Sequence, residues 1–211
     1  MITKKTKDFF TAEEKERIRQ AVAAAEAGTS GEIATMVVAE SDSYREAQLL
    51  GVMFLSGFLA LVVSIIIRHV TIWSYIPLVF LLGLPAFFLF VRFPRLKLAF
   101  AGRRRLNEAV RNRAVKAFFE KGLYRTRDET GVLIFISLLE RKVWILGDRG
   151  INARIRPESW GSLAADLAAG IRGGRACSAL CAIIASCGEE LGRYFPKGTD
   201  IGNELPDEVI L

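Results

Sequence analysis

Two long apolar runs dominate the pattern of the chain. Residues 47–67 and 70–91 contain 21 and 22 residues without a charge, and only Arg68 and His69 lie between them. Each run reaches the roughly 20 residues that an α-helix needs to cross about 30 Å of hydrocarbon. The alternative is a pair of buried soluble helices, but such helices rarely carry more than about 14 unbroken apolar residues. The pattern therefore predicts a transmembrane helical hairpin over residues 47–92, with both outer ends on the same side of the membrane.

A polar segment before the hairpin predicts one helix and one strand. Thr11 is followed three residues later by Glu14, which is the pattern of a capping box at the start of a helix. Apolar residues then recur at helical spacing, at Ile18, Ala21, Val22 and Ala25. Residues 33–39 are rich in β-branched and apolar residues and predict a buried strand. Because one strand is not stable alone, we expect its partners to follow the hairpin.

The segment after the hairpin supplies those partners. Residues 131–137 and 142–146 are apolar runs joined by a short polar turn, and they predict an antiparallel β-hairpin. Strands that are apolar on both faces need helices on both sides. The helices expected to cover them are the first helix, a long basic helix from about Leu96 to Lys121, a helix that begins at Pro157 and ends before Gly173, and a last helix from about Arg175 to Tyr194.

These elements predict an α/β fold, in which a small helix-covered sheet of three or four strands is interrupted by a two-helix transmembrane hairpin. The expected organisation is a first part of the domain over residues 1–46, the hairpin over 47–92, a second part of the domain over 93–198, and an extended tail over 199–211.

Composition and charge place the hairpin in a membrane and orient it. The chain is 51% hydrophobic and 25% charged, which excludes a disordered chain and argues against a purely soluble one. Residues 92–121 hold ten Lys or Arg and two Glu. Positively charged flanks stay on the cytoplasmic side, so we expect a multi-pass protein of the bacterial inner membrane with both termini cytoplasmic. We expect no signal peptide before the hairpin.

The basic segment over residues 92–121 also predicts the binding partners of the protein. A Lys or Arg near an anionic leaflet contributes on the order of 1 kcal/mol, so anionic lipid head groups are expected to bind beside the bilayer. Nucleic acid is not expected, because no interleaved aromatic platform or binding motif accompanies the charge. The remaining predicted partner is another membrane protein.

Three segments resemble a known family. TSGEIATMVV (29–38), GLYRTRDETGVLIFISLLERKVWILGDRGI (122–151) and NELPD (203–207) resemble bacterial membrane proteins that carry a TPM domain, the family that includes a thylakoid-lumen acid phosphatase. The resemblance implies an α/β sandwich. It also implies either phosphatase activity or a role in assembling and maintaining membrane complexes. Many members keep the domain outside the cytoplasm behind a signal peptide, whereas this chain interrupts it with a hairpin.

Acidic residues at the ends of the predicted strands are the candidate site residues. Glu32 precedes the first strand, Asp128 and Glu129 precede the second, and Asp148 follows the third. Asp128, Glu129 and Asp148 predict a site for a hard cation, Ca²⁺ or Mg²⁺, which prefers oxygen ligands. The alternative is that they occupy ordinary turns, where Asp and Gly are favoured for backbone reasons.

Other groups of residues give weaker indications of a functional site. His69 is the only histidine and lies in the hairpin turn, so the domain has no Ser-His-Asp or Cys-His pair. Arg172 and Arg175 flank a glycine pair that predicts an anion site through backbone N–H groups, or simply the end of one helix and the start of the next. Three cysteines share a helical stripe and are expected to be buried. The sequence thus predicts a non-catalytic module that docks on or helps maintain a membrane protein complex, with a divalent-metal-dependent phosphatase as the alternative. No catalytic residue is assigned.

Overall fold

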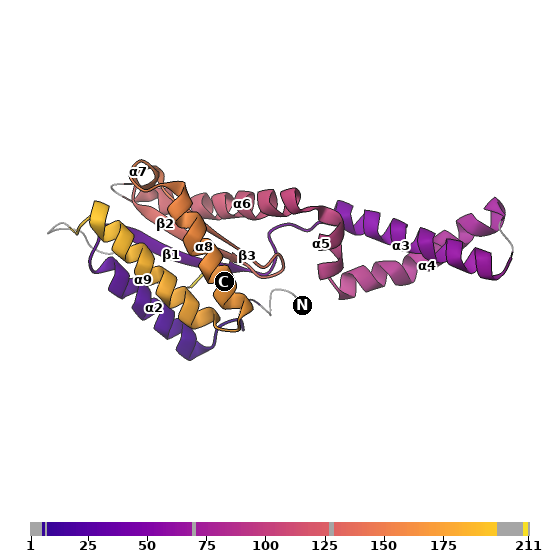
Figure 1. Cartoon of the computed structure of the whole chain (residues 1–211), viewed down its shortest axis with the longest axis horizontal. Coiled ribbons are helices and arrows are strands. Elements are labelled where there is room, and N and C mark those ends of the chain that lie inside the picture. Colours follow the sequence, from indigo (N-terminus) through magenta and orange to yellow (C-terminus); the bar gives the residue numbers. More distant parts are fainter. Residues whose placement is uncertain (1–5, 7, 69–70, 127–128, 198–208, 211) are drawn as a thin grey trace. The chain divides into compact units, whose positions relative to one another are not determined.

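The structure is a computed structural model that describes residues 6, 8–68, 71–126, 129–197 and 209–210 (Figure 1). The chain forms two compact units, which we describe separately: residues 1–41 with 109–211, and residues 42–108. The elements in chain order are α2 (Ala12–Glu26), β1 (Glu32–Val38), α3 (Arg45–Ile66), α4 (Ile72–Arg92), α5 (Arg95–Ala101), α6 (Arg103–Glu120), the 3₁₀ turn η1 (Leu123–Arg125), β2 (Gly131–Ser137), β3 (Lys142–Gly147), α7 (Arg149–Asn152), α8 (Pro157–Arg172) and α9 (Ala176–Tyr194).

The first unit is built on a three-stranded sheet in the order β1-β2-β3. β1 and β2 are parallel neighbours, with Glu32 opposite Gly131 and Val38 opposite Ser137. β2 and β3 are antiparallel, with Val132 opposite Gly147. The strand that precedes the hairpin therefore pairs directly with a strand that follows it. The sheet has three strands among the described residues, the lower of the two numbers expected.

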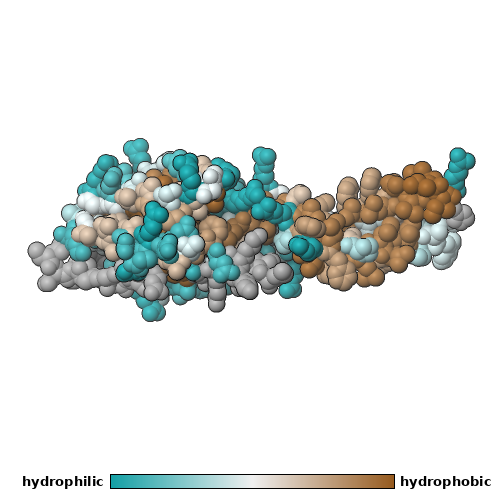
Figure 2. Space-filling view, turned by 90° about the horizontal axis from the view of Figure 1, so that it is seen from below, coloured by the Kyte–Doolittle hydropathy of each residue, from teal (hydrophilic) through white to brown (hydrophobic). Residues whose placement is uncertain are grey.

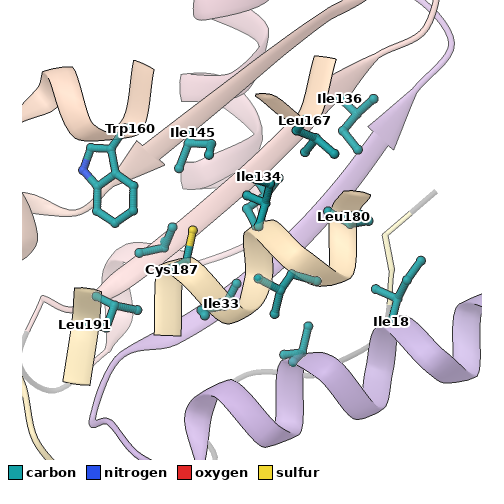
Figure 3. Packing of buried hydrophobic residues seen from close by; sticks show 14 of the residues in the cluster. Ile18, Ile33, Ile134, Ile136, Ile145, Trp160, Leu167, Leu180, Cys187 and Leu191 are labelled. Carbon is teal, nitrogen blue, oxygen red and sulfur yellow. The ribbon is translucent and has the colours of Figure 1, made fainter. Parts of the chain in front are cut away.

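Helices cover both faces of this sheet. Side chains alternate along a strand, so Ile33 and Ile134 face α2, α8 and α9, while Ala34 and Leu133 face α6. Figure 3 shows the first of these two cores, in which Trp160 of α8 and residues of α9 lie over the strands. Every residue of β2 is buried, which confirms the prediction that its strand is covered on both sides.

The first helix confirms the capping box. The Thr11 hydroxyl accepts a hydrogen bond from the Glu14 amide at 3.2 Å, and the Thr11 amide donates to Glu14 Oε2 at 2.9 Å. Further along, α2 packs against α9 so closely that a Cβ atom on Gly188 would lie 2.7 Å from Ala25 Cβ. An element before the hairpin and an element near the end of the chain thus share one core.

The outer edge of β1 is partly occupied by the end of the chain. The Ile210 amide donates to the Thr35 carbonyl at 2.8 Å, and the Val37 amide donates to the Ile210 carbonyl at 2.9 Å. Residues 199–208 and 211 of the predicted tail lie outside the described residues. The tail was expected to be extended, and its contact with the sheet edge was not predicted.

The long basic helix predicted from Leu96 to Lys121 is wrong as a single element. Gly102 adopts a φ of 72°, in the left-handed region that favours glycine, and separates α5 from α6. The residues on either side of Gly102 are good helix formers, and for this reason the sequence pattern predicted one continuous helix.

The second unit contains two apolar helices. By length and composition, α3 and α4 are each long and apolar enough to cross a membrane. They pack on each other through small residues: the ring of Phe90 fills the space beside Gly51, and the Tyr75 hydroxyl donates to the Gly57 carbonyl at 3.1 Å. Large apolar side chains cover the outside of both helices (Figure 2, brown). Such a surface suits hydrocarbon rather than water.

Candidate functional site

Three of the acidic residues singled out in the sequence lie at one end of the sheet. Glu32 opens β1 opposite the first residue of β2, and Glu129 lies two residues before that strand. Asp148 follows β3, and its amide donates to the Gly131 carbonyl at 2.8 Å. The topology therefore brings Glu32, Glu129 and Asp148 to the same end of the sheet. Asp128 lies outside the described residues.

Asp148 uses only one of its carboxylate oxygens. Its Oδ1 accepts a hydrogen bond from the Arg149 amide at 2.7 Å and so caps α7. Its Oδ2 is buried and has no hydrogen-bond partner in the part of the chain that the structure describes. Glu129, in contrast, is exposed and adopts a φ of 52° in the turn before β2. Within the described ranges no three His, Cys, Asp or Glu side chains gather closely enough to hold a metal ion. The Ca²⁺ or Mg²⁺ site at Asp128, Glu129 and Asp148 stays a prediction.

The glycine pair between α8 and α9 forms a helix cap. The amides of Gly173, Gly174 and Arg175 donate to carbonyls of the last turns of α8, at 3.0, 3.1 and 3.0 Å. Gly174 has the positive φ of 73° that such caps favour. These N–H groups are therefore committed within the protein. The side chains of Arg172 and Arg175 are exposed, and the anion site assigned to them stays a prediction.

The cysteines are part of the packing. Cys177 and Cys187 are buried in the core beneath α9, and Cys181 is half-buried beside it. Burial, with a smaller contribution from the charge of Glu190, raises the pKa of the Cys187 thiol to about 12. A thiol with this pKa is a poor nucleophile at neutral pH. The expected burial is confirmed for Cys177 and Cys187, whereas Cys181 is only half-buried.

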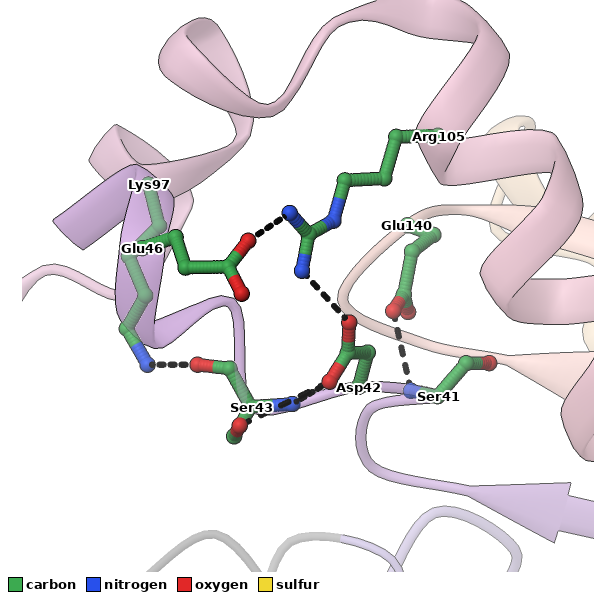
Figure 4. Close-up of polar contacts among 7 residues, drawn as sticks. All are labelled: Ser41, Asp42, Ser43, Glu46, Lys97, Arg105 and Glu140. Atoms are coloured by element: carbon green, nitrogen blue, oxygen red, sulfur yellow. Dashed lines mark hydrogen bonds and ion pairs between the residues drawn. The ribbon is translucent and has the colours of Figure 1, made fainter. Parts of the chain in front are cut away.

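A polar cluster at the base of the hairpin was not predicted (Figure 4). Arg105, in the first turns of α6, donates to Glu46 of α3, and it also donates to Asp42 Oδ2 at 3.4 Å. These two hydrogen bonds, that to Glu46 foremost, raise the pKa of the Arg105 guanidinium above its ordinary value. The Lys97 side chain is buried and its Nζ donates to the Ser43 carbonyl at 3.3 Å. The residues entering the hairpin are thus bonded to the residues leaving it.

A second polar group fixes the end of β1 within the first unit. The Ser41 amide donates to Glu140 Oε1 at 2.9 Å (Figure 4). The Ser41 hydroxyl donates to Ser137 Oγ at 2.8 Å. The Ser137 hydroxyl in turn donates to Glu140 Oε2. The turn between β2 and β3 therefore holds the last residues of the sheet before the chain leaves for the hairpin.

Comparison with known proteins supports the fold alone. The chain is similar to BA42, a protein of the psychrophilic bacterium Bizionia argentinensis whose structure was determined by NMR, with a TM-score of 0.59 and 22% sequence identity. The similarity covers 96% of this chain and 94% of BA42. No model of a known protein family matches the chain. A comparison with curated proteins gives no match either.

Proposed function

We propose that this protein is a membrane-anchored, non-catalytic docking module with a TPM-like domain, which docks on or helps maintain a membrane protein complex at the bacterial inner membrane. The observation that carries the proposal is the pairing of β1 with β2 across two helices of membrane-spanning length. The two apolar helices lie between β1 and β2 in the chain, so the folded domain is joined to the hairpin at both of its ends. This architecture suits a permanent anchor.

Exposed aromatic residues give the first unit a surface for a protein partner. Phe119 is 58% exposed and Tyr124 is 41% exposed, and their ring centroids lie 5.6 Å apart. The Arg125 guanidinium lies 5.5 Å from the Tyr124 ring centroid. Aromatic residues and arginine are the residue types most enriched at the centres of protein interfaces. We infer that these three residues contact the partner.

Quantitative cross-linking of the full chain in native membranes tests the docking role. A specific adduct is expected with the wild-type protein, and its yield is expected to fall at least tenfold in the Phe119→Ala/Tyr124→Ala variant. The matched control is Tyr194→Ala, because Tyr194 is similarly exposed, at 43%, on α9. An adduct that survives the double substitution, or is lost equally in the control, would refute the assigned surface.

The proposed topology is tested separately. Reporter fusions at residues 1 and 211 are both expected to report the cytoplasm, because the basic flank of the hairpin favours that side. An external readout at either end would overturn the orientation.

A divalent-metal-dependent phosphatase is the second candidate, favoured by one observation. The buried Oδ2 of Asp148 lacks a hydrogen-bond partner among the described residues, and a cation is one group that would satisfy it. The docking proposal expects the full chain in detergent to hydrolyse p-nitrophenyl phosphate no faster than an Asp148→Asn variant, with either Mg²⁺ or Ca²⁺ present. Metal-dependent hydrolysis that the substitution abolishes would favour the phosphatase.

A further inference from the structure

The short helix α5 leaves its apolar side chains exposed on one face. Leu96 and Phe100 are four residues apart and therefore lie on the same face of the helix, and they are 38% and 37% exposed. Phe93, immediately before the helix, is 50% exposed. A neighbouring face of α5 packs against α3, where Lys97 and Ala101 are buried.

This apolar face continues the outer surface of the hairpin. The Phe100 ring lies 6.1 Å from the ring of Phe54 on α3 and 5.8 Å from the ring of Phe90 on α4, measured between centroids. Phe54 is itself among the exposed apolar residues of the hairpin. If hydrocarbon covers Phe54, it reaches the edge of α5 as well.

Three arginines around α5 have no acidic partner among the described residues. Arg104 pairs with Glu108, and Arg105 is bonded to the carboxylates at the base of the hairpin. In contrast, no carboxylate of the described residues lies within 4.0 Å of the guanidinium groups of Arg92, Arg95 or Arg103, and all three side chains are exposed. An apolar face and unpaired cations thus occur together on one short segment.

We propose that α5 lies in the plane of the membrane surface and that Arg92, Arg95 and Arg103 bind the phosphates of anionic phospholipids. The inference rests on the proposed insertion of the hairpin. Interfacial helices bury an apolar face just below the head groups and keep basic residues at their level. A guanidinium group matches a phosphate with two parallel hydrogen bonds, which makes arginine well suited to this ligand.

The ends of α5 fit this role. Pro94 stands before its first residue, and Gly102 ends it with a positive φ. Proline is tolerated at the start of a helix and glycine favours its end, so both residues let the chain change direction there. The helix can therefore follow the membrane surface without continuing the direction of α4 or α6.

Native mass spectrometry of the full chain tests the lipid site. The protein is released from micelles that contain equal amounts of phosphatidylcholine and phosphatidylglycerol, and the retained lipids are counted. We expect the wild-type chain to retain phosphatidylglycerol preferentially, and Arg92→Gln/Arg95→Gln to weaken that preference by about fivefold for each arginine, from about 1 kcal/mol per charge. The control Arg104→Gln/Arg111→Gln removes the same charge from α6 and is expected to retain the wild-type preference.

The outcomes separate the lipid site from the anchor. Extraction of the wild-type chain from membranes by alkaline carbonate would contradict the proposed hairpin insertion. A chain that resists carbonate but shows no preference for phosphatidylglycerol, or loses it equally in both double variants, would overturn the lipid site and leave the anchor standing.

A photo-crosslinking residue at Leu96 tests the position of α5 directly. In native membranes it is expected to give adducts with phospholipid. An adduct with a protein in place of lipid would show that a partner covers α5, and would also overturn the proposal.

Discussion

Replacement of Gly188 by alanine tests whether the segments on either side of the hairpin form one core. The added Cβ would lie 2.7 Å from Ala25 Cβ and 3.0 Å from Ala25 Cα, whereas ordinary van der Waals contact begins at 3.4 Å. Since neither Ala25 atom can move by a side-chain rotation, α2 and α9 must separate by about 0.7 Å, the difference between 3.4 and 2.7 Å. Overpacking of this kind costs about 1–3 kcal/mol.

Gly161→Ala is the matched control, because it makes the same change inside α8, where the new methyl group meets no atom within 4 Å. Alanine raises helix propensity at both positions by up to about 1 kcal/mol, so the difference between the variants isolates the packing cost. Gly188→Ala is expected to be less stable than Gly161→Ala by about 1–3 kcal/mol. Urea unfolding of the full chain in detergent, followed by tryptophan fluorescence, measures this difference through Trp160, which lies in the same core (Figure 3). Equal stability of the two variants would refute the close packing of α2 on α9.

Three further substitutions or titrations follow from the local structure. Burial that raises the pKa of Cys187 to about 12 is expected to protect it from iodoacetamide at pH 8 in the folded protein, with alkylation only after unfolding, as read by peptide mass spectrometry. The hydrogen bond from Arg19 lowers the pKa of Glu16 to about 2 from 4.5, so its contribution to stability is present above pH 4.5 and is lost as the pH falls toward 2. Carbon-detected NMR titration is expected to find the Glu16 midpoint near 2, and to find it raised in Arg19→Gln; a normal midpoint in the wild type would contradict the bond. Gly131→Ala would place a Cβ 2.5 Å from the Leu123 carbonyl oxygen. We expect the free energy of unfolding to fall by about 1–3 kcal/mol in the same urea assay, and an unchanged value would contradict this close contact.

The strands were predictable to within one residue, and the ends of α3 and α4 to within two, because their signals are local. β2 has the predicted bounds, and β3 is one residue longer than predicted, since runs of β-branched residues between polar turns have few alternative structures. The break at Gly102 was missed because a single glycine within a helical pattern can be tolerated and does not by itself mark the end of a helix.

The polar cluster at the base of the hairpin could not be predicted from spacing. Arg105 lies 59 residues from Glu46 and 63 from Asp42, so only the folded hairpin brings the charges together. The edge contact of Ile210 with β1 could not be predicted from spacing either. It consists of two backbone hydrogen bonds, which any extended residue can form. The cation site is a different case, since its prediction depended partly on Asp128, outside the described residues.

The parallel pairing of β1 with β2 sets an order of events during synthesis. Residue 131 is translated 99 residues after its neighbour Glu32, a delay of about 5–20 seconds at ordinary rates of elongation. During that interval the ribosome synthesises both apolar helices, and β1 cannot yet pair with β2. Ribosome-stalled chains that end before residue 131 are expected to lose β1 to protease, and stalled chains in which α9 has emerged are expected to protect it. Both helices of membrane-spanning length are thus synthesised before the sheet can be completed.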